Sequence, residues 1–212
     1  MNNLIRVLVA TIILSFFSCK QKKQDETIIT SPNAKDSVAS LQGMVTSPFA
    51  PIDISPMDMS YFPPDYPKLK MTNATAQAPL ARIIYSRPHL QGRRLFPDIL
   101  KYNEPWRLGA NEATELQLFK DARIQDKTIP AGRYVLYCIP SADQWTFVIN
   151  SNIDSWGLRQ DTTKDLARFK VPASTTPIKH EYFSIVFEGN AGNADLLMAW
   201  ENIEVRLPIV FK

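Results

Sequence analysis

Side chains that could bind or transform a ligand are concentrated between Tyr85 and Thr114, where a simple strand scaffold would show alternating apolar residues. Residues 85–88 read YSRP and residues 106–114 read WRLGANEAT. Arginine matches a carboxylate or phosphate with two parallel hydrogen bonds, and tryptophan offers a flat face to a sugar ring. We therefore expect a pocket for a small polar ligand or glycan. Its expected frame is Tyr85, Arg87, Trp106, Arg107, Asn111 and Glu112.

Two other interpretations of the same residues stay open. In a hydrolytic enzyme, Glu112 would be the candidate catalytic acid or base, and Arg87 or Arg107 would stabilise negative charge. In a structural envelope protein, the polar string would only brace loops, for example through an ion pair between Arg107 and Glu112. Packing in the core competes with ligand contact as the role of Trp106.

Several kinds of chemistry receive no support. The chain has two histidines, His89 and His180, and none of the usual zinc-ligand spacings. Neither a Gly-x-Ser-x-Gly string nor a glycine loop for phosphate occurs. Cys138 lies in an apolar run and is expected to be a small buried hydrophobe. The sequence thus predicts no metal and no cofactor.

The N-terminus predicts a lipoprotein signal peptide over residues 1–18. A short cationic start is followed by an apolar run, Val7 to Phe17, which is shorter than the roughly 20 residues of a membrane-spanning helix. Ser15–Cys19 resembles a bacterial lipobox, so Cys19 is expected to carry the lipid; an ordinary signal peptide is the alternative. The expected location is the bacterial cell envelope, with the lipid holding the chain on the outer membrane, facing the periplasm.

Residues 19–75 are rich in proline and polar residues and predict a flexible tether. Within this segment, Met57–Phe62 is more apolar than a linker needs, so we expect it to dock on the folded domain. The formal net charge of +3 is close to balance, and therefore nucleic-acid binding is not expected. The expected partners are the membrane, through Cys19, and a small ligand.

Residues 76–212 predict a single all-β domain. Apolar residues alternate with polar ones around Ala167–Val171, Phe183–Phe187 and Ile203–Ile209. Turn signals, one of them Pro172–Ser174, recur about every ten residues, which favours an antiparallel β-sandwich or a partly closed barrel. At most one or two short helices are expected, one of them at Pro97–Tyr102, where proline suits a first helical turn.

The strings YSRP (85–88), WRLGANEAT (106–114) and PAGRY (130–134), together with the closing Trp200-Glu201-Asn202, resemble the bacterial family called domain of unknown function 2911. The likeness extends over nearly all residues after Ala81, and the second string is its most specific part. It implies a compact, envelope-associated domain of uncharacterised activity and supplies no catalytic residues. The chain departs from the family pattern at Phe96–Asp98 and Lys101–Asn103, so these loops are expected to differ in shape or ligand.

Overall fold

A computed structural model describes residues 53–73 and 77–211. The chain divides into two units, Met1–Pro51 and Ile52–Lys212, and all described residues belong to the second. The predicted signal peptide, Cys19 and most of the predicted tether lie outside the described residues. None of the helices in the described part is both long enough and apolar enough to cross a membrane.

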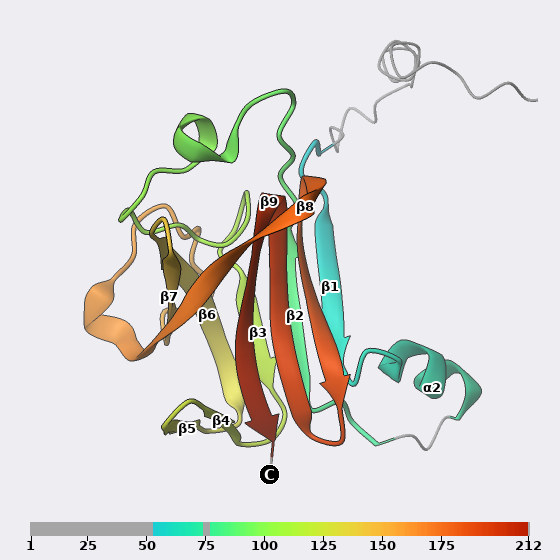
Figure 1. Cartoon of the computed structure of the whole chain (residues 1–212). Coiled ribbons are helices and arrows are strands. Elements are labelled where there is room, and N and C mark those ends of the chain that lie inside the picture. The colour runs from blue at the N-terminus through green and yellow to red at the C-terminus, as the bar shows by residue number, and fades with distance from the viewer. Residues whose placement is uncertain (1–52, 74–76, 212) are drawn as a thin grey trace, which may run out of the picture. The chain divides into compact units, whose positions relative to one another are not determined.

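The described strands form one antiparallel sheet in the order β1-β2-β3-β6-β7-β8-β9-β4-β5 (Figure 1). The strands of the first half of the chain are β1 (Met57–Phe62), β2 (Ala81–Ser86), β3 (Glu115–Leu118), β4 (Ala122–Ile124) and β5 (Lys127–Ile129). The later strands are β6 (Gly132–Pro140), β7 (Gln144–Asn150), β8 (Asp165–Asn190) and β9 (Asn193–Phe211). Because the sheet folds over without closing, the predicted all-β, sandwich-like fold is confirmed.

The long strand β8 joins the two halves of the sandwich. Up to Pro172 it pairs with β7, and from Ala173 onward it pairs with β9. Figure 1 shows β8 crossing from β7 to the side of β9. The sequence predicts a loop at Pro172–Ser174, but the chain stays extended there and only changes partner. Proline suits this position because it lacks the backbone N–H that a continuous ladder would use.

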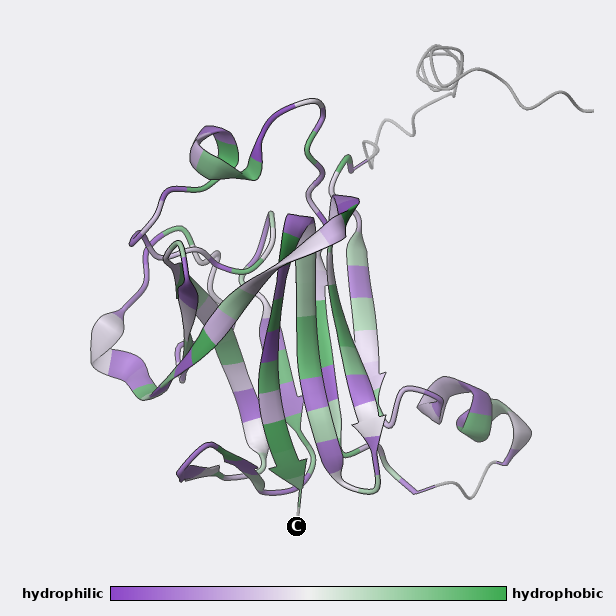
Figure 2. Ribbon diagram, viewed as in Figure 1, coloured by the Kyte–Doolittle hydropathy of each residue, from purple (hydrophilic) through white to green (hydrophobic). Residues whose placement is uncertain are grey.

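The core lies between the two halves and follows the predicted alternation. Phe183, Ile185 and Phe187 of β8 are at most 2 % exposed. Val205 and Leu207 of β9 are equally buried, and Figure 2 shows hydrophobic and hydrophilic residues alternating along the strands. Each such side chain contributes about 1.5–3 kcal/mol when fully buried, so this alternation fixes which face of each strand turns inward.

Strand β1 docks on the domain, as expected for its apolar patch. It pairs with β2 along its whole length, from Met57 opposite Ser86 to Phe62 opposite Ala81. Phe62 is buried, and its ring stacks on Phe211 with centroids 5.5 Å apart. The strand falls inside the segment 19–75 that the sequence assigns to the tether, so the folded unit begins before residue 76.

The helical segments are short: α2 (Tyr66–Thr72), a wide turn η1 (Leu95–Ile99) and a 3-10 turn η2 (Thr162–Lys164). The helix predicted at Pro97–Tyr102 is therefore displaced toward the N-terminus. The backbone N–H of Leu100 donates to the carbonyl oxygen of Leu95 at 2.9 Å and ends the turn. Tyr102 lies beyond it and stacks on Phe96 with centroids 4.1 Å apart.

Candidate functional site

The six residues predicted to frame one pocket are divided among different surroundings. Trp106 and Arg107 border a cavity of about 340 Å³. Tyr85 and Glu112 border a second cavity of about 430 Å³. Arg87 and Asn111 border neither of these cavities and are engaged in internal hydrogen bonds. The structure thus does not bring the six together in one pocket.

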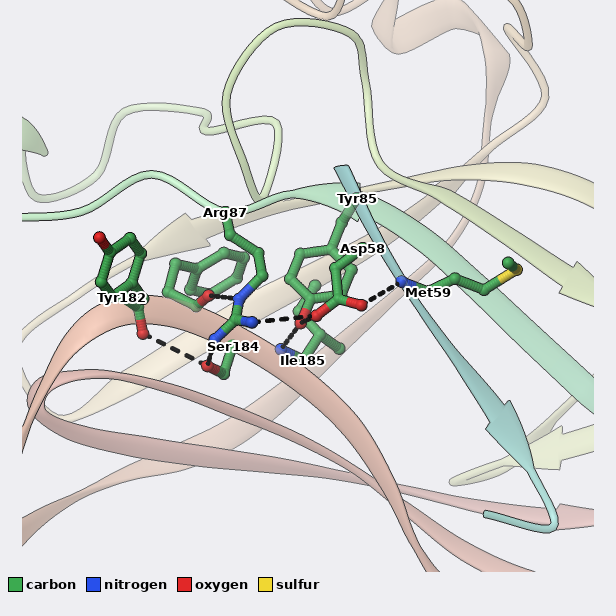
Figure 3. A network of polar contacts seen from close by, with 8 residues as sticks. Asp58, Met59, Tyr85, Arg87, Tyr182, Ser184 and Ile185 are labelled. Atoms are coloured by element: carbon green, nitrogen blue, oxygen red, sulfur yellow. Dashed lines mark hydrogen bonds and ion pairs between the residues drawn. The ribbon is translucent and has the colours of Figure 1, made fainter. Parts of the chain in front are cut away.

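Tyr85 and Arg87 belong to a polar network with Asp58 that joins β1, β2 and β8 (Figure 3). The Tyr85 hydroxyl accepts a hydrogen bond from the backbone N–H of Ile185 at 2.8 Å. Arg87 Nη1 lies 3.2 Å from Asp58 Oδ2, and Arg87 Nη2 donates to Ser184 Oγ at 3.1 Å. Burial from water is the main cause that raises the pKa of Tyr85 to about 12; the hydrogen bond from the Ile185 N–H opposes this shift, and the nearby Asp58 carboxylate adds to it.

The same network satisfies the edge of β8 that faces away from β9. Arg87 Nε donates to the carbonyl oxygen of Phe183 at 3.2 Å, and the N–H of Phe187 donates to Ser60 Oγ at 3.1 Å. Together with the bond from Ile185 to Tyr85, side chains of β1, of β2 and of Arg87 just after β2 take the place of a neighbouring strand. Because an unpaired buried backbone group is costly, the YSRP string supports the sandwich structurally.

The first cavity, called here the Trp106–Arg107 cavity, carries positive charge in an otherwise apolar wall. Its lining is Pro88, Arg93, Ile99, Leu100, Pro105, Trp106, Arg107, Gly109, Ala110, Gly157, Leu158 and Trp200. This set contains two arginines and no carboxylate. Arg107 Nε is buried and has no hydrogen-bond partner among residues 53–73 and 77–211. Burial lowers the pKa of Arg107, while the field of Glu112 opposes that shift.

Trp106 both packs in the core and borders the cavity. Its backbone pairs with Cys138 of β6 through N–H to carbonyl hydrogen bonds of 2.7 and 2.9 Å. Its indole Nε1 donates to the Gly109 carbonyl oxygen at 3.1 Å, and the ring stacks on Trp200 with centroids 5.6 Å apart. Trp145 and Trp200 lie in the core, with exposures of 2 % and 1 %. These contacts hold the partly exposed Trp106 ring in a fixed orientation.

A glycine lets the loop before η2 approach Arg107 closely. Gly157 has a φ of +75°, and a Cβ added there would lie 2.9 Å from Ala113 Cβ and 3.0 Å from Arg107 Cβ. Gln160 Nε2 donates to the Gly157 carbonyl oxygen at 2.8 Å and holds the loop in place. A side chain at this position would therefore strain the backbone and displace the stem of Arg107.

The second cavity has acidic walls. It is lined by Met57, Ile84, Tyr85, Ser86, Glu112, Ala113, Glu115, Asp154, Ser155 and Trp156. Arg133 Nη2 lies 2.9 Å from Glu115 Oε2 and 3.1 Å from Asp154 Oδ1, which neutralises part of this charge. Glu112 is exposed and, within the described residues, forms no hydrogen bond or close ion pair. The direct Arg107–Glu112 ion pair considered from the sequence is thus absent from this part of the structure, and the two groups interact only through the longer-range field.

The WRLGANEAT string folds as a tight loop. Leu108 and Asn111 both have a φ of +56°, a left-handed conformation that asparagine tolerates better than most residues. Asn111 Nδ2 donates to Asp53 Oδ2 at 2.7 Å, and the buried Thr114 Oγ1 donates to the Leu108 carbonyl oxygen at 2.6 Å. Much of this string therefore shapes the loop, and Trp106, Arg107, Gly109 and Ala110 are its members that line the first cavity.

The two histidines and Cys138 lie outside both cavities, and His180 Nε2 is buried without a hydrogen-bond partner in the described residues. The His89 ring stacks on Tyr182 with centroids 5.0 Å apart, and His180 Nε2 lies 3.6 Å from Glu204 Oε1. Cys138 is buried, and this burial raises the pKa of its thiol. In the part of the chain that the structure describes, no group of three or more His, Cys, Asp and Glu side chains is placed to hold a metal ion.

Of the residues that line this cavity, only Trp106 and Arg107 were predicted as site residues; Arg93, Gly157 and Leu158 are among those that were not. Arg93 was visible as a charge beside the YSRP string, so charge density could have indicated it. Gly157 and Leu158 lie about 50 residues further along, and no local pattern connects them with Arg107. Asp58 and Ser184, which hold Arg87, gave no signal at all.

Comparison with known proteins gives one family. A family model described as "Protein of unknown function (DUF2911)" matches residues 67–209, which is most of the chain. No curated protein and no solved structure matches the chain. The resemblance inferred from the motifs is therefore confirmed, and it carries no activity with it.

Proposed function

Because the chain belongs to the DUF2911 family, whose description assigns no activity, we propose from the geometry that the domain binds a small polar ligand in the Trp106–Arg107 cavity. The observation that carries this proposal is the Arg107 guanidinium, whose Nε is buried without a hydrogen-bond partner in the described residues. A buried donor without a partner costs about 1–3 kcal/mol, and a ligand oxygen would recover that free energy. The partly exposed indole of Trp106 adds a flat wall.

The enzymatic alternative has less support. A hydrolytic site would need Glu112 and an arginine to converge on one substrate. Glu112 borders the second cavity, Arg107 borders the first, and Arg87 is held by Asp58, Phe183 and Ser184. The bracing alternative describes Tyr85 and Arg87 well, but it leaves Arg107 unexplained.

We also propose that this binding domain is displayed on the bacterial cell envelope as a lipoprotein. The support is the sequence alone: the cationic start, the apolar run and the lipobox-like Ser15–Cys19. Metabolic labelling with a fatty-acid analogue tests this directly. The full chain should incorporate the label and fractionate with membranes, and a Cys19→Ala variant should do neither; an unlabelled wild-type chain would contradict the proposal.

A thermal-shift screen tests the binding site. The chain would start at residue 19 with Cys19→Ser, so that no lipid is added, and the ligands would include monosaccharides, sugar acids, organic acids and phosphates. At least one should raise the melting temperature of the wild type but not that of Arg107→Gln. Arg94→Gln is the matched control because Arg94 is exposed, pairs with Asp98 and does not line the cavity. A shift that survives in Arg107→Gln would place the ligand elsewhere.

A further inference from the structure

The Trp106–Arg107 cavity concentrates positive charge, and no carboxylate is among its lining residues. Arg93 is oriented by two backbone acceptors, since its Nε donates to the Leu90 carbonyl oxygen at 2.9 Å and its Nη2 to the His89 carbonyl oxygen at 3.2 Å. These are neutral partners, so they position the guanidinium without cancelling its charge. With Arg107, two guanidinium groups border one space whose lining contains no carboxylate.

Three carboxylates on the neighbouring turns are already committed, whereas Glu112 is uncommitted within the described part of the chain and acts on Arg107 only through its longer-range field. Asp98 accepts hydrogen bonds from the backbone N–H and the side chain of Arg94. Glu201 Oε2 accepts from the backbone N–H of Leu95 at 3.2 Å, and Glu181 Oε1 accepts from that of Gln91 at 2.8 Å. Moving any of them to Arg93 or Arg107 would release one of these bonds. A bound anionic ligand could contact Arg93 and Arg107 without breaking any of these hydrogen bonds.

The aromatic wall adds a second requirement. The Trp106 ring stacks on Trp200 and packs against Phe183 in an edge-to-face arrangement with ring centroids 4.8 Å apart, so it has little freedom to rotate. Gly109 and Gly157 also line the cavity and place no side chain in it. A volume of about 340 Å³ is at the small end for ligand pockets, which suits a single ring with one attached group.

We infer that the ligand is a small organic anion in which one ring with an apolar face carries a carboxylate or a phosphate. The ring lies along the Trp106 indole, and the anionic group lies between Arg93 and Arg107. This inference rests on the proposed function, since it specifies the ligand of the same cavity. Planar guanidinium groups bind either anion in a bidentate manner, so carboxylate and phosphate are separate arms of the test.

Isothermal titration calorimetry on the non-lipidated chain with Cys19→Ser tests the inference. The compounds are D-glucuronate, D-glucose 6-phosphate, D-glucose and inorganic phosphate. At least one of the two charged sugars should bind at least about tenfold more tightly than D-glucose and than inorganic phosphate, because charge-assisted hydrogen bonds and ring contact add together. The tighter of the two identifies the anionic group, and added salt should weaken its binding.

Matched variants connect that result to the cavity. Arg93→Gln and Arg107→Gln should each weaken the charged sugar by about tenfold or more. Arg94→Gln should leave its affinity within about twofold, since Arg94 pairs with Asp98 outside the lining. Leu158→Trp should weaken every sugar, because Leu158 is 72 % exposed at the cavity and can be enlarged without disturbing the core.

The outcomes separate the inference from the proposed function. If D-glucose binds as tightly as the charged sugars and both Arg107→Gln and Leu158→Trp reduce its affinity, the cavity binds ligands but the anionic inference is wrong. If inorganic phosphate matches the charged sugars, the ring requirement is wrong. If none of the four compounds binds, both the inference and the proposed function are overturned for this cavity.

Discussion

Replacing Tyr85 with phenylalanine removes one buried hydroxyl and leaves the ring in place. The hydroxyl accepts the backbone N–H of Ile185 at 2.8 Å, on the edge of β8 that has no neighbouring strand there. Ile185 is fully buried, so water cannot easily take over this bond. The hydroxyl also lies 3.4 Å from Asp58 Oδ2, a long hydrogen bond of smaller value.

The expected loss of stability follows from these contacts. A buried donor without a partner costs about 1–3 kcal/mol, and no cavity is created because only one oxygen atom is removed. We therefore expect Tyr85→Phe to lower the free energy of unfolding by about 1–3 kcal/mol. For a domain of this size that corresponds to a decrease in melting temperature of roughly 2–12 °C.

Urea unfolding followed by tryptophan fluorescence measures this loss. Tyr182→Phe is the matched control because Tyr182 is 44 % exposed and its hydroxyl forms no hydrogen bond within residues 53–73 and 77–211. A loss below about 0.5 kcal/mol for Tyr85→Phe, or an equal loss for Tyr182→Phe, would refute the edge-satisfying role. Tyr85→Phe should also leave ligand binding unchanged, since Tyr85 does not border the Trp106–Arg107 cavity.

Three further predictions concern the loop glycine, the tyrosines and the cysteine. Gly157→Ala should destabilise the domain and weaken ligand binding more than Gly92→Ala does, as measured by unfolding and by calorimetry. Both glycines have a positive φ, but only at Gly157 would an added Cβ meet close neighbours. Equal effects of the two substitutions would contradict this prediction. Stability should fall as pH rises from about 10 to about 12. The cause is that Tyr85 and Tyr137 have a pKa of about 12 in the folded domain, whereas tyrosine in the unfolded chain loses its proton near pH 10. Urea midpoints that stay constant over this pH range would contradict the prediction. Cys138 should react with a thiol reagent only after unfolding, and rapid labelling of the native protein would contradict its burial.

The strands were predictable where one face is buried and the other is exposed to solvent. Alternation at Phe183–Phe187 and Ile203–Ile209 arises from local burial, which the sequence displays directly. The path of β8 through Pro172 was not predictable, because a proline followed by alanine and serine also fits a loop. Strand β1 was visible only as an apolar patch, since prolines flank it and conceal the pairing with β2.

The site was predictable in its residue types but not in its grouping. Tyr85, Arg87, Trp106 and Arg107 are close in sequence, which suggested one pocket. The first two follow β2 to the edge of β8, whereas Trp106 pairs with Cys138 of β6. Such separations depend on partners far away along the chain, and no local spacing reveals them. The family match shows that the chain belongs to the family, but it does not indicate which residues share a pocket.

The most direct test of the central claim is a titration followed by the indole N–H signals of the four tryptophans in a ¹H–¹⁵N NMR spectrum. D-glucuronate and D-glucose 6-phosphate would be added separately to the non-lipidated chain. The account predicts that the Trp106 signal shifts to saturation with at least one of them, while the signal of Trp156, which borders the second cavity, stays in place. Arg107→Gln should abolish the shift. A stationary Trp106 signal with both compounds, or a shift at Trp156 instead, would contradict the proposed site.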